Sequence, residues 1–413
     1  MKQSESRQPL NHIDNLEQLI QKGTKVPEPK SVYVGEDVDI ERISGEGVTL
    51  YPGTRICGKS SFIAKGAQIS AEGTATILNC YIGPYAELKG GFFNESVFLA
   101  KTSCGLGSHV REGTILEEQA SIAHTVGLKQ TILFPFVTLG SLINFCDCFM
   151  SGGTGRQNHS EVGSSYIHFN FTPNQDKATP SLIGDIPRGV MLNQSPIFLG
   201  GQGGLVGPSR LEFGTVIAAG TINRKDQLKE NHLVLGEKSR SGSVPYSTGT
   251  YYNLRRILRN NIIYIGNLYA LRQWYIHVRS QFTGDDFAPE LFDGLKSTLM
   301  LGISERIKQL GRLADKLAET NAHDGIQHDF PKAWQKIESR FEALIDFSGN
   351  DDERESFLEQ IARLIGHQGK DYLRVIKSLD MNQRQAGTGW LDEIVSKVVQ
   401  ETSQCVTSLA KRP

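Results

Sequence analysis

The chain has 413 residues, which is room for two or three domains with a substantial core. Its 44 Lys and Arg residues nearly balance 45 Asp and Glu residues, and this net charge of −1 gives no reason to expect nucleic acid as a partner. No stretch approaches the roughly eighteen apolar residues of a transmembrane helix and the polar N-terminus has no signal-peptide core, so we expect no membrane span.

Residues 1–30 are predicted to cap the N-terminal end of the molecule. Between Asn11 and Ile20, aliphatic residues recur at helical spacing on one face of a short amphipathic helix: Ile13, Leu16, Leu19 and Ile20. Repeat structures need such a segment to cover the open end of the first repeat. Pro27 and Pro29 then end the cap.

Residues 31–240 repeat a six-residue pattern, in which an aliphatic residue is often followed by Gly or Ala. The clearest units begin at Val34, Leu50, Ile63, Ile82, Leu106 and Ile217. Stacked units of this length predict a parallel β-helix, whose triangular turns take one hexad for each flat side. The aliphatic side chains then point inward and glycines serve the corners, and unbroken hexads of this type indicate the left-handed form.

Three stretches of this region need separate interpretation. Residues 71–76 and 175–179 lose the register of the hexads and are expected to protrude as loops. The glycine-rich run 198–207 lacks the Lys-Ser/Thr of a phosphate loop, so corner glycines explain it better. The alternative fold is an antiparallel β-sandwich with Gly-rich turns, but its strands recur about every eight to twelve residues rather than every six.

Residues 250–413 are predicted to form an all-α domain, joined to the repeat by a Ser- and Gly-rich linker over 239–250. A long helix begins at Asn253 and carries five arginines beside its apolar stripe: Arg255, Arg256, Arg259, Arg272 and Arg279. Its basic face is interpreted as solvated or packed on the coil rather than as a phosphate site. Further helices are predicted at about residues 288–320, 331–347, 352–367 and 387–411, with Pro331 in the first turn of its helix.

The six cysteines are scattered along the chain, and only Cys146 and Cys148 lie close together. One intervening residue is too few for the usual zinc-binding CxxC spacing, so this pair is read as two ordinary thiols on one face of a strand. The sequence therefore predicts no metal site, and it favours a reducing, cytoplasmic setting.

Candidate chemistry gathers at residues 144–176, where polar residues interrupt the hexads. Four landmarks occur in and just after this region: Asn144-Phe145, His159, Asn170-Phe171 and Ile183-Gly184-Asp185. In this order and at similar spacing they resemble the acetyltransferase half of the bacterial bifunctional enzyme that makes UDP-N-acetylglucosamine from glucosamine-1-phosphate. The resemblance covers about residues 80–225. It implies a left-handed β-helix, a homotrimer, and transfer of an acyl group from acetyl-CoA or another acyl-CoA to a sugar phosphate or nucleotide sugar.

The resemblance also assigns roles to individual residues. His159 would be the general base that takes a proton from the acceptor as it attacks the thioester, and Glu161 would orient or tune it. Substrate binding is expected at five further residues: Asn144, Arg156, Asn170, Phe171 and Lys177. His168, in an alternating strand, is a second candidate for the base.

The sequence departs from the family at several of its functional positions. Phe149 stands where the family has a phosphate-binding Lys, Val162 replaces the Tyr after the catalytic His, and Thr172-Pro173 replaces an Asp-Gly. Nothing in the chain matches the nucleotidyltransferase half. These departures leave an alternative prediction open, a non-catalytic sugar-nucleotide-binding or scaffold protein that kept the β-helix.

Overall fold

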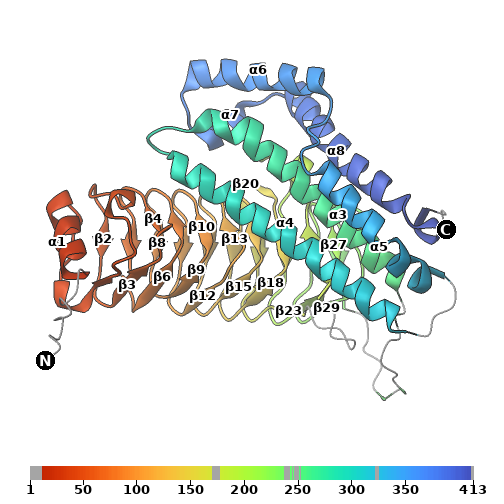
Figure 1. Cartoon of the computed structure of the whole chain (residues 1–413), viewed down its shortest axis with the longest axis horizontal. Coiled ribbons are helices and arrows are strands. Elements are labelled where there is room, and N and C mark those ends of the chain that lie inside the picture. The colour runs from red at the N-terminus through yellow and green to blue at the C-terminus, as the bar shows by residue number, and fades with distance from the viewer. Residues whose placement is uncertain are drawn as a thin grey trace, which may run out of the picture.

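The computed structural model describes residues 12–169, 177–236, 242–243, 245, 251, 253–320 and 325–410. A parallel β-helix is followed by a helical C-terminal region, so the predicted fold class is confirmed. In Figure 1 the coil runs across the view, with α1 at one end and the C-terminal helices along one side. Within the described ranges, no helix has the length and apolar character needed to cross a membrane.

Three long parallel sheets form the sides of the coil. Sheet A contains β2 (Thr49–Leu50), β5 (Gln68–Ile69), β8 (Glu87–Leu88), β11 (Ser103–Cys104), β14 (Ser121–Ile122), β17 (Thr138–Leu139), β22 (Glu161–Val162), β25 (Phe198–Leu199), β28 (Val216–Ile217) and β30 (Leu233–Val234). Sheet B contains β1 (Tyr33–Val34), β3 (Thr54–Cys57), β6 (Ala75–Leu78), β9 (Gly91–Asn94), β12 (Ser108–Val110), β15 (Gly127–Lys129), β18 (Asn144–Cys146), β23 (Ile167–Phe169), β26 (Gly204–Val206) and β29 (Ile222–Asn223). Sheet C contains β4 (Phe62–Ile63), β7 (Tyr81–Ile82), β10 (Ser96–Phe98), β13 (Thr114–Leu116), β16 (Ile132–Leu133), β19 (Cys148–Met150), β24 (Ser181–Ile183) and β27 (Arg210–Leu211).

The pairing register shows that one turn of the coil is close to three hexads. On sheet A, paired residues from Thr49 to Thr138 lie 16 to 19 positions apart in the sequence. Side chains alternate across a strand, so the first residue of a two-residue strand points outward and the second inward. In β14, for example, Ser121 is partly exposed whereas Ile122 is buried. The inward ladder of aliphatic residues is the core of the coil.

The corners between sheets C and A use ordinary L-residues in the left-handed backbone region. Tyr85, Lys101, Gln119 and Phe136 have φ values of 58°, 60°, 60° and 73°. Such a conformation costs an L-residue roughly 1–2 kcal/mol. The amide of each corner offsets part of this cost by donating to a carbonyl of the corner below, as Lys101 does to the Pro84 oxygen at 2.8 Å. The prediction that glycines serve the corners is therefore wrong for these four turns.

The N-terminal cap has the form that the aliphatic spacing predicts. Helix α1 (His12–Lys22) buries Leu16 and Leu19 against the first coil. The Asn15 side-chain amide also donates to the Gly35 carbonyl at 2.9 Å. The predicted protruding loop at residues 71–76 is wrong in its second half, because Ala75 and Thr76 already pair in β6.

The C-terminal region begins with α3 and contains seven α-helices and two shorter turns among the described residues: α3 (Leu254–Gln273), a π-helical turn η3 (Trp274–Val278), a 3-10 turn η4 (Arg279–Phe282), α4 (Pro289–Ala318), α5 (Gly325–Leu344), α6 (Asp351–Gln368), α7 (Tyr372–Ser378), α8 (Met381–Ser403) and α9 (Thr407–Ala410). The predicted helices at 288–320 and 352–367 are confirmed as α4 and α6. Pro331 lies inside α5 rather than in its first turn. Helix α8 begins earlier than predicted because Asp380 caps it with a capping box, and α7 was not predicted.

The described helices of the C-terminal region pack on sheet C rather than on sheets A and B along most of the coil. Helix α4 lies against β7, β10 and β13, and α3 contacts β24 (Figure 1). Among the arginines of α3, Arg256 packs on the coil and donates to the Pro208 carbonyl at 2.6 Å, whereas Arg255 and Arg259 are exposed. Two buried ion pairs also join the helical region to the coil: Arg306 of α4 with Asp147 at 2.7 Å, and Arg279 of η4 with Glu118 at 2.5 Å.

The contact between α4 and sheet C depends on a glycine, which gives a first test. A Cβ at Gly294 would lie 2.5–2.8 Å from three atoms of the Tyr81 ring. Gly294→Ala should therefore lower the free energy of unfolding by about 1–3 kcal/mol, since overpacking forces rigid groups apart. Gly389→Ala on α8 is the matched control, because a Cβ there meets nothing within 4 Å. Urea denaturation of both variants measures the difference, and equal stabilities would contradict this account of the packing.

A buried carboxyl between the coil and the helices gives a second test. Burial raises the pKa of Glu117 to about 7, and the Tyr275 hydroxyl donates to its Oε1 at 2.6 Å. The pKa of a Glu in the unfolded chain is near 4.5. Between pH 4.5 and 7, Glu117 is therefore protonated in the native state but ionised in the unfolded state. Unfolding free energy should then fall by about 3 kcal/mol as pH rises from 4.5 through 7. Glu117→Gln keeps an acceptor for Tyr275 and should remove this slope; an unchanged slope in the variant would assign the pH dependence elsewhere.

Candidate functional site

Insertions interrupt the coil at two consecutive turns, and they contain most of the predicted site residues. On sheet A, Thr138 and Glu161 pair although they lie 23 positions apart, and Glu161 and Phe198 pair across 37 positions. Segments inserted into a regular repeat are where binding and catalytic residues concentrate. The extra residues fall at 151–160, 170–180 and 184–197, the last of which includes α2 (Ile186–Gly189). The predicted loop at 175–179 is part of the second insertion, and its residues 175–176 lie outside the described residues.

The first insertion is a small antiparallel hairpin between sheets C and A. Strand β20 (Gly153–Gly155) pairs with β21 (Asn158–His159). Gly153 has φ +99°, and a Cβ there would lie 2.6 Å from the Asn158 carbonyl oxygen, so only glycine fits this close approach. Buried Ser160 fixes the base of the hairpin, because its hydroxyl donates to the Ser151 carbonyl at 2.7 Å and accepts from the Ile197 amide at 2.8 Å.

Arg156, at the turn of the hairpin, ties it to the coil. Its Nη1 donates to the carbonyls of Gln119 and Phe136 at 3.0 and 2.9 Å and to the Thr138 hydroxyl at 3.1 Å. The Gln119 and Phe136 carbonyls belong to the two corners below the hairpin. The predicted role of Arg156 in substrate binding stays a prediction, although its Nη1 already has three acceptors.

His159 and Glu161, at the end of β21 and the start of β22 (Glu161–Val162), lie close together. His159 Nε2 is 3.8 Å from Glu161 Oε2, and the two side chains are 20% and 48% exposed. Nδ1 of His159 is shielded from solvent and has no hydrogen-bond partner among the described residues. An imidazole beside a carboxylate with one ring nitrogen uncommitted is an arrangement that can accept a proton.

Of the other predicted residues, Asn144 and Lys177 are described and lie on other parts of the coil than the hairpin. Asn144 lies in sheet B, exposed, and accepts from the Cys146 thiol at 3.1 Å. Lys177 is exposed just before β24, at the corner between sheets B and C. Asn170 and Phe171 lie outside the described residues, and His168 is described only in its backbone, as part of β23.

A basic group that the sequence analysis missed lies beside the hairpin. Lys377 of α7 places its Nζ 4.4 Å from the centroid of the Phe136 ring and 3.6 Å from the position of a Cβ on Gly155. Partial burial lowers the pKa of Lys377. No hexad pattern could indicate this residue, since it comes from a helix more than 200 positions further along the chain.

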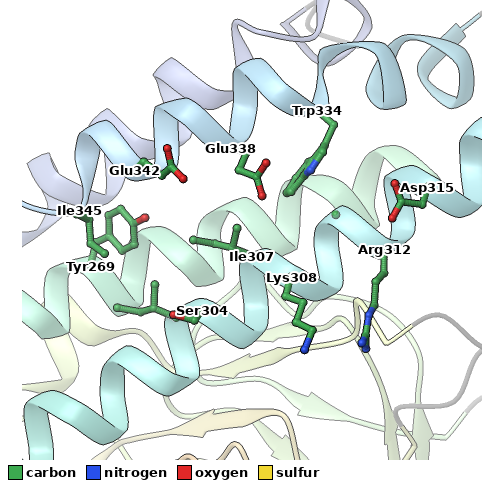
Figure 2. Close-up of a pocket in the computed structure, with 12 residues that line it drawn as sticks. Tyr269, Ser304, Ile307, Lys308, Arg312, Asp315, Trp334, Glu338, Glu342 and Ile345 are labelled. Carbon is green, nitrogen blue, oxygen red and sulfur yellow. The ribbon is translucent and has the colours of Figure 1, made fainter.

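A separate groove of about 490 Å³ lies between α4 and α5 (Figure 2). Lys308 and Arg312 come from α4, and Glu338 and Glu342 from α5, with Trp334 near one end. It contains none of the predicted site residues. Among the described residues, no three His, Cys, Asp or Glu side chains are grouped to hold a metal ion.

About half of this chain, including the β-helix, is similar in sequence to curated proteins. No family model matches it. The Bifunctional protein GlmU of Thermotoga maritima is 26% identical over 211 residues, which cover 51% of this chain and 42% of the relative. Those of Pelobacter propionicus and Clostridium novyi are each 27% identical, over 50% and 51% of this chain and 40% and 41% of the relatives. The chain thus spans less than half the length of these relatives. Together with the fold, they confirm the resemblance predicted from the sequence landmarks.

Proposed function

We propose that the chain is an acyl-CoA-dependent acyltransferase that acts on a sugar phosphate or a nucleotide sugar, with His159 as general base. The observation that carries this proposal is the pairing of His159 with Glu161 at the inserted hairpin. The similarity to the GlmU proteins and the shared β-helix support it. Acetyl-CoA is the proposed donor on the same grounds.

In the proposed reaction an amine or hydroxyl of the acceptor attacks the thioester carbonyl. His159 takes the proton of the attacking group, the carbon–sulfur bond breaks, and the CoA thiolate leaves and is protonated. Glu161 stabilises the imidazolium that forms, because its carboxylate lies 3.8 Å from the imidazole in the structure. Lys377 takes the acceptor's phosphate, because Arg156 is already held by the coil.

A homotrimer fits the distribution of exposed side chains. Helices cover sheet C, whereas sheets A and B and the corner between them carry exposed apolar residues: Leu142, Ile167, Phe198, Val216, Ile222 and Leu233. Apolar patches of this kind mark contacts between proteins. Packing sheet A of one protomer near sheet B of the next would bring a neighbouring Asn144 toward the hairpin. The six free cysteines suit the reducing cytoplasm that we expect.

The second candidate is a non-catalytic protein that binds a nucleotide sugar or serves as a scaffold. Two observations favour it: Arg156 is engaged by the coil, and Asn144 and Lys177 lie away from His159 in a single chain.

A direct assay separates the two candidates. The full chain is incubated with acetyl-CoA and a panel of amino-sugar phosphates and UDP-linked amino sugars, and released CoA is measured by chromatography. A thiol reagent is unsuitable because the protein has six free cysteines of its own. Acceptor-dependent release of CoA supports the acyltransferase. Saturable binding of the sugars without any release supports the binding protein.

A further inference from the structure

A cleft of about 200 Å³ separates the coil from the helices at the corner between sheets C and A. The coil contributes three successive corners to it, through Tyr85, Lys101 and Gln119, and the helical region contributes η4 and the start of α7. The volume is below the roughly 300–1,000 Å³ of pockets for drug-sized ligands, so its occupant is about one ring in size.

The floor of the cleft has polar atoms without partners. Arg279 is 1% exposed and its Nη2 bonds Glu118 Oε1 at 2.5 Å. In the part of the chain that the structure describes, Nε and Nη1 of Arg279 and Oε2 of Glu118 have no hydrogen-bond partner. Buried donors and acceptors left unmet are costly and rare in folded proteins, so two donors beside one acceptor indicate a ligand that both accepts and donates.

The walls are aromatic. The Arg279 guanidinium carbon lies 3.8 Å from the centroid of the Tyr372 ring and 4.6 Å from that of Phe287. Tyr85 stands at the mouth, 51% exposed, with its ring over Gly66. Flat apolar faces next to a few buried polar groups are the usual composition of a small-molecule site.

The charges around the cleft determine which ligand fits. Glu118 compensates Arg279 at the floor, and Glu117 lies behind them. At the rim, the lining includes Lys101 and Lys370 together with Asp286 and Asp371, and Asp286 also pairs with Lys65 at 2.9 Å. The lining side chains therefore carry as many positive as negative charges, so neither an anion nor a cation is favoured.

We propose that this cleft binds a neutral polyhydroxylated ring, a single sugar unit, separately from the His159 hairpin. Hydroxyl groups accept from Arg279 and donate to Glu118 at once, which neither a phosphate nor an ammonium group does. The faces of the sugar ring pack against the Tyr85 and Tyr372 side chains. Because the floor atoms are closed off from solvent, the ligand parts the rim between the coil and α7 to reach them. The proposal does not depend on acyl transfer.

Titration of the full chain with four probes tests the proposal. Methyl α-D-glucopyranoside and N-acetylglucosamine are the neutral sugars, glucose 6-phosphate is the anion and glucosamine the cation. At this cleft the neutral probes should bind saturably with a Kd in the range of about 1 mM, and the charged probes more weakly. Binding of glucose 6-phosphate that exceeds that of the neutral probes and is lost in Tyr85→Ala, or no saturation by any neutral probe, overturns the proposal.

Single variants test whether the neutral sugars bind in this cleft. Tyr85→Ala should weaken the neutral probes by about threefold to tenfold, since a stacking contact is lost at an exposed position. Leu301→Ala, exposed to a similar extent on α4, is the matched control and should bind as the wild type does. His159→Ala should also keep full affinity, which separates this cleft from the proposed transferase site. Unchanged affinity in Tyr85→Ala, or loss in His159→Ala, would refute the assignment to the cleft.

Discussion

Replacing His159 with alanine should lower kcat/KM for acyl transfer by about 10²–10⁴-fold, the usual contribution of a positioned general base. The fold should survive, because the side chain is 20% exposed and the hairpin is held by Arg156 and by Ser160 instead. The matched control is His124→Ala. In the wild type the His124 imidazole lies on another corner of the coil and is hydrogen-bonded to the Ser141 hydroxyl at 2.8 Å. Released CoA and circular dichroism are measured for both proteins.

Three outcomes of that experiment differ in meaning. A loss in His159→Ala with full activity in His124→Ala supports the assigned base. Equal activity in His159→Ala and the wild type would rule it out, and the same measurement on His168→Ala would then test the second candidate. A fall confined to kcat with KM unchanged would indicate an interaction made only in the transition state, as a base requires.

Glu161→Gln separates orientation from proton transfer. The amide keeps the size of the side chain at 3.8 Å from the imidazole but carries no charge to stabilise an imidazolium. We expect a smaller loss of kcat/KM than in His159→Ala, about 10-fold or less, because the base itself remains in place. A loss as large as that of His159→Ala would make Glu161 a direct participant.

The coil could be predicted from the sequence because the residues of its core follow a short local pattern. Each inward residue, such as Ile122 or Leu139, is an aliphatic at a fixed place in its own hexad, and stacking repeats one contact many times. The corners were harder to foresee. Lys101 and Gln119 adopt positive φ because their own amides donate to carbonyls one turn away, and these bonds depend on the neighbouring turn of the coil rather than on residue type.

The candidate site also combines residues that are close in the sequence with residues that come from distant segments. His159 and Glu161 are two positions apart, and their proximity follows from the sequence. The acceptors that engage Arg156 are mainly backbone carbonyls of earlier turns, which no residue pattern reports. Lys377 and Arg279 reach the coil from helices far along the chain, so their placement depends on how the helices dock on sheet C.

Replacing Arg306 with alanine should destabilise the protein by about 3–5 kcal/mol, because it leaves the buried carboxylate of Asp147 without its ion-pair partner. Their side chains are 4% and 9% exposed, and the pair joins α4 to a corner of the coil. Arg363→Ala is the matched control: its pair with Glu359 on α6 is 72% and 69% exposed and should contribute at most about 0.5 kcal/mol. Urea denaturation measures both.

The double variant Arg306→Met with Asp147→Asn tests the reason for the loss. It removes both charges while keeping the bulk of the side chains, and asparagine tolerates the φ of +56° at position 147. If the uncompensated charge causes the loss, the double variant should regain most of the stability.

The three tryptophans, Trp274, Trp334 and Trp390, all belong to the helical region, so their fluorescence follows the helices while far-ultraviolet dichroism follows the whole chain. Separate transitions in Arg306→Ala would mean that the helices leave sheet C before the coil unfolds, whereas coincident transitions would make coil and helices one cooperative unit.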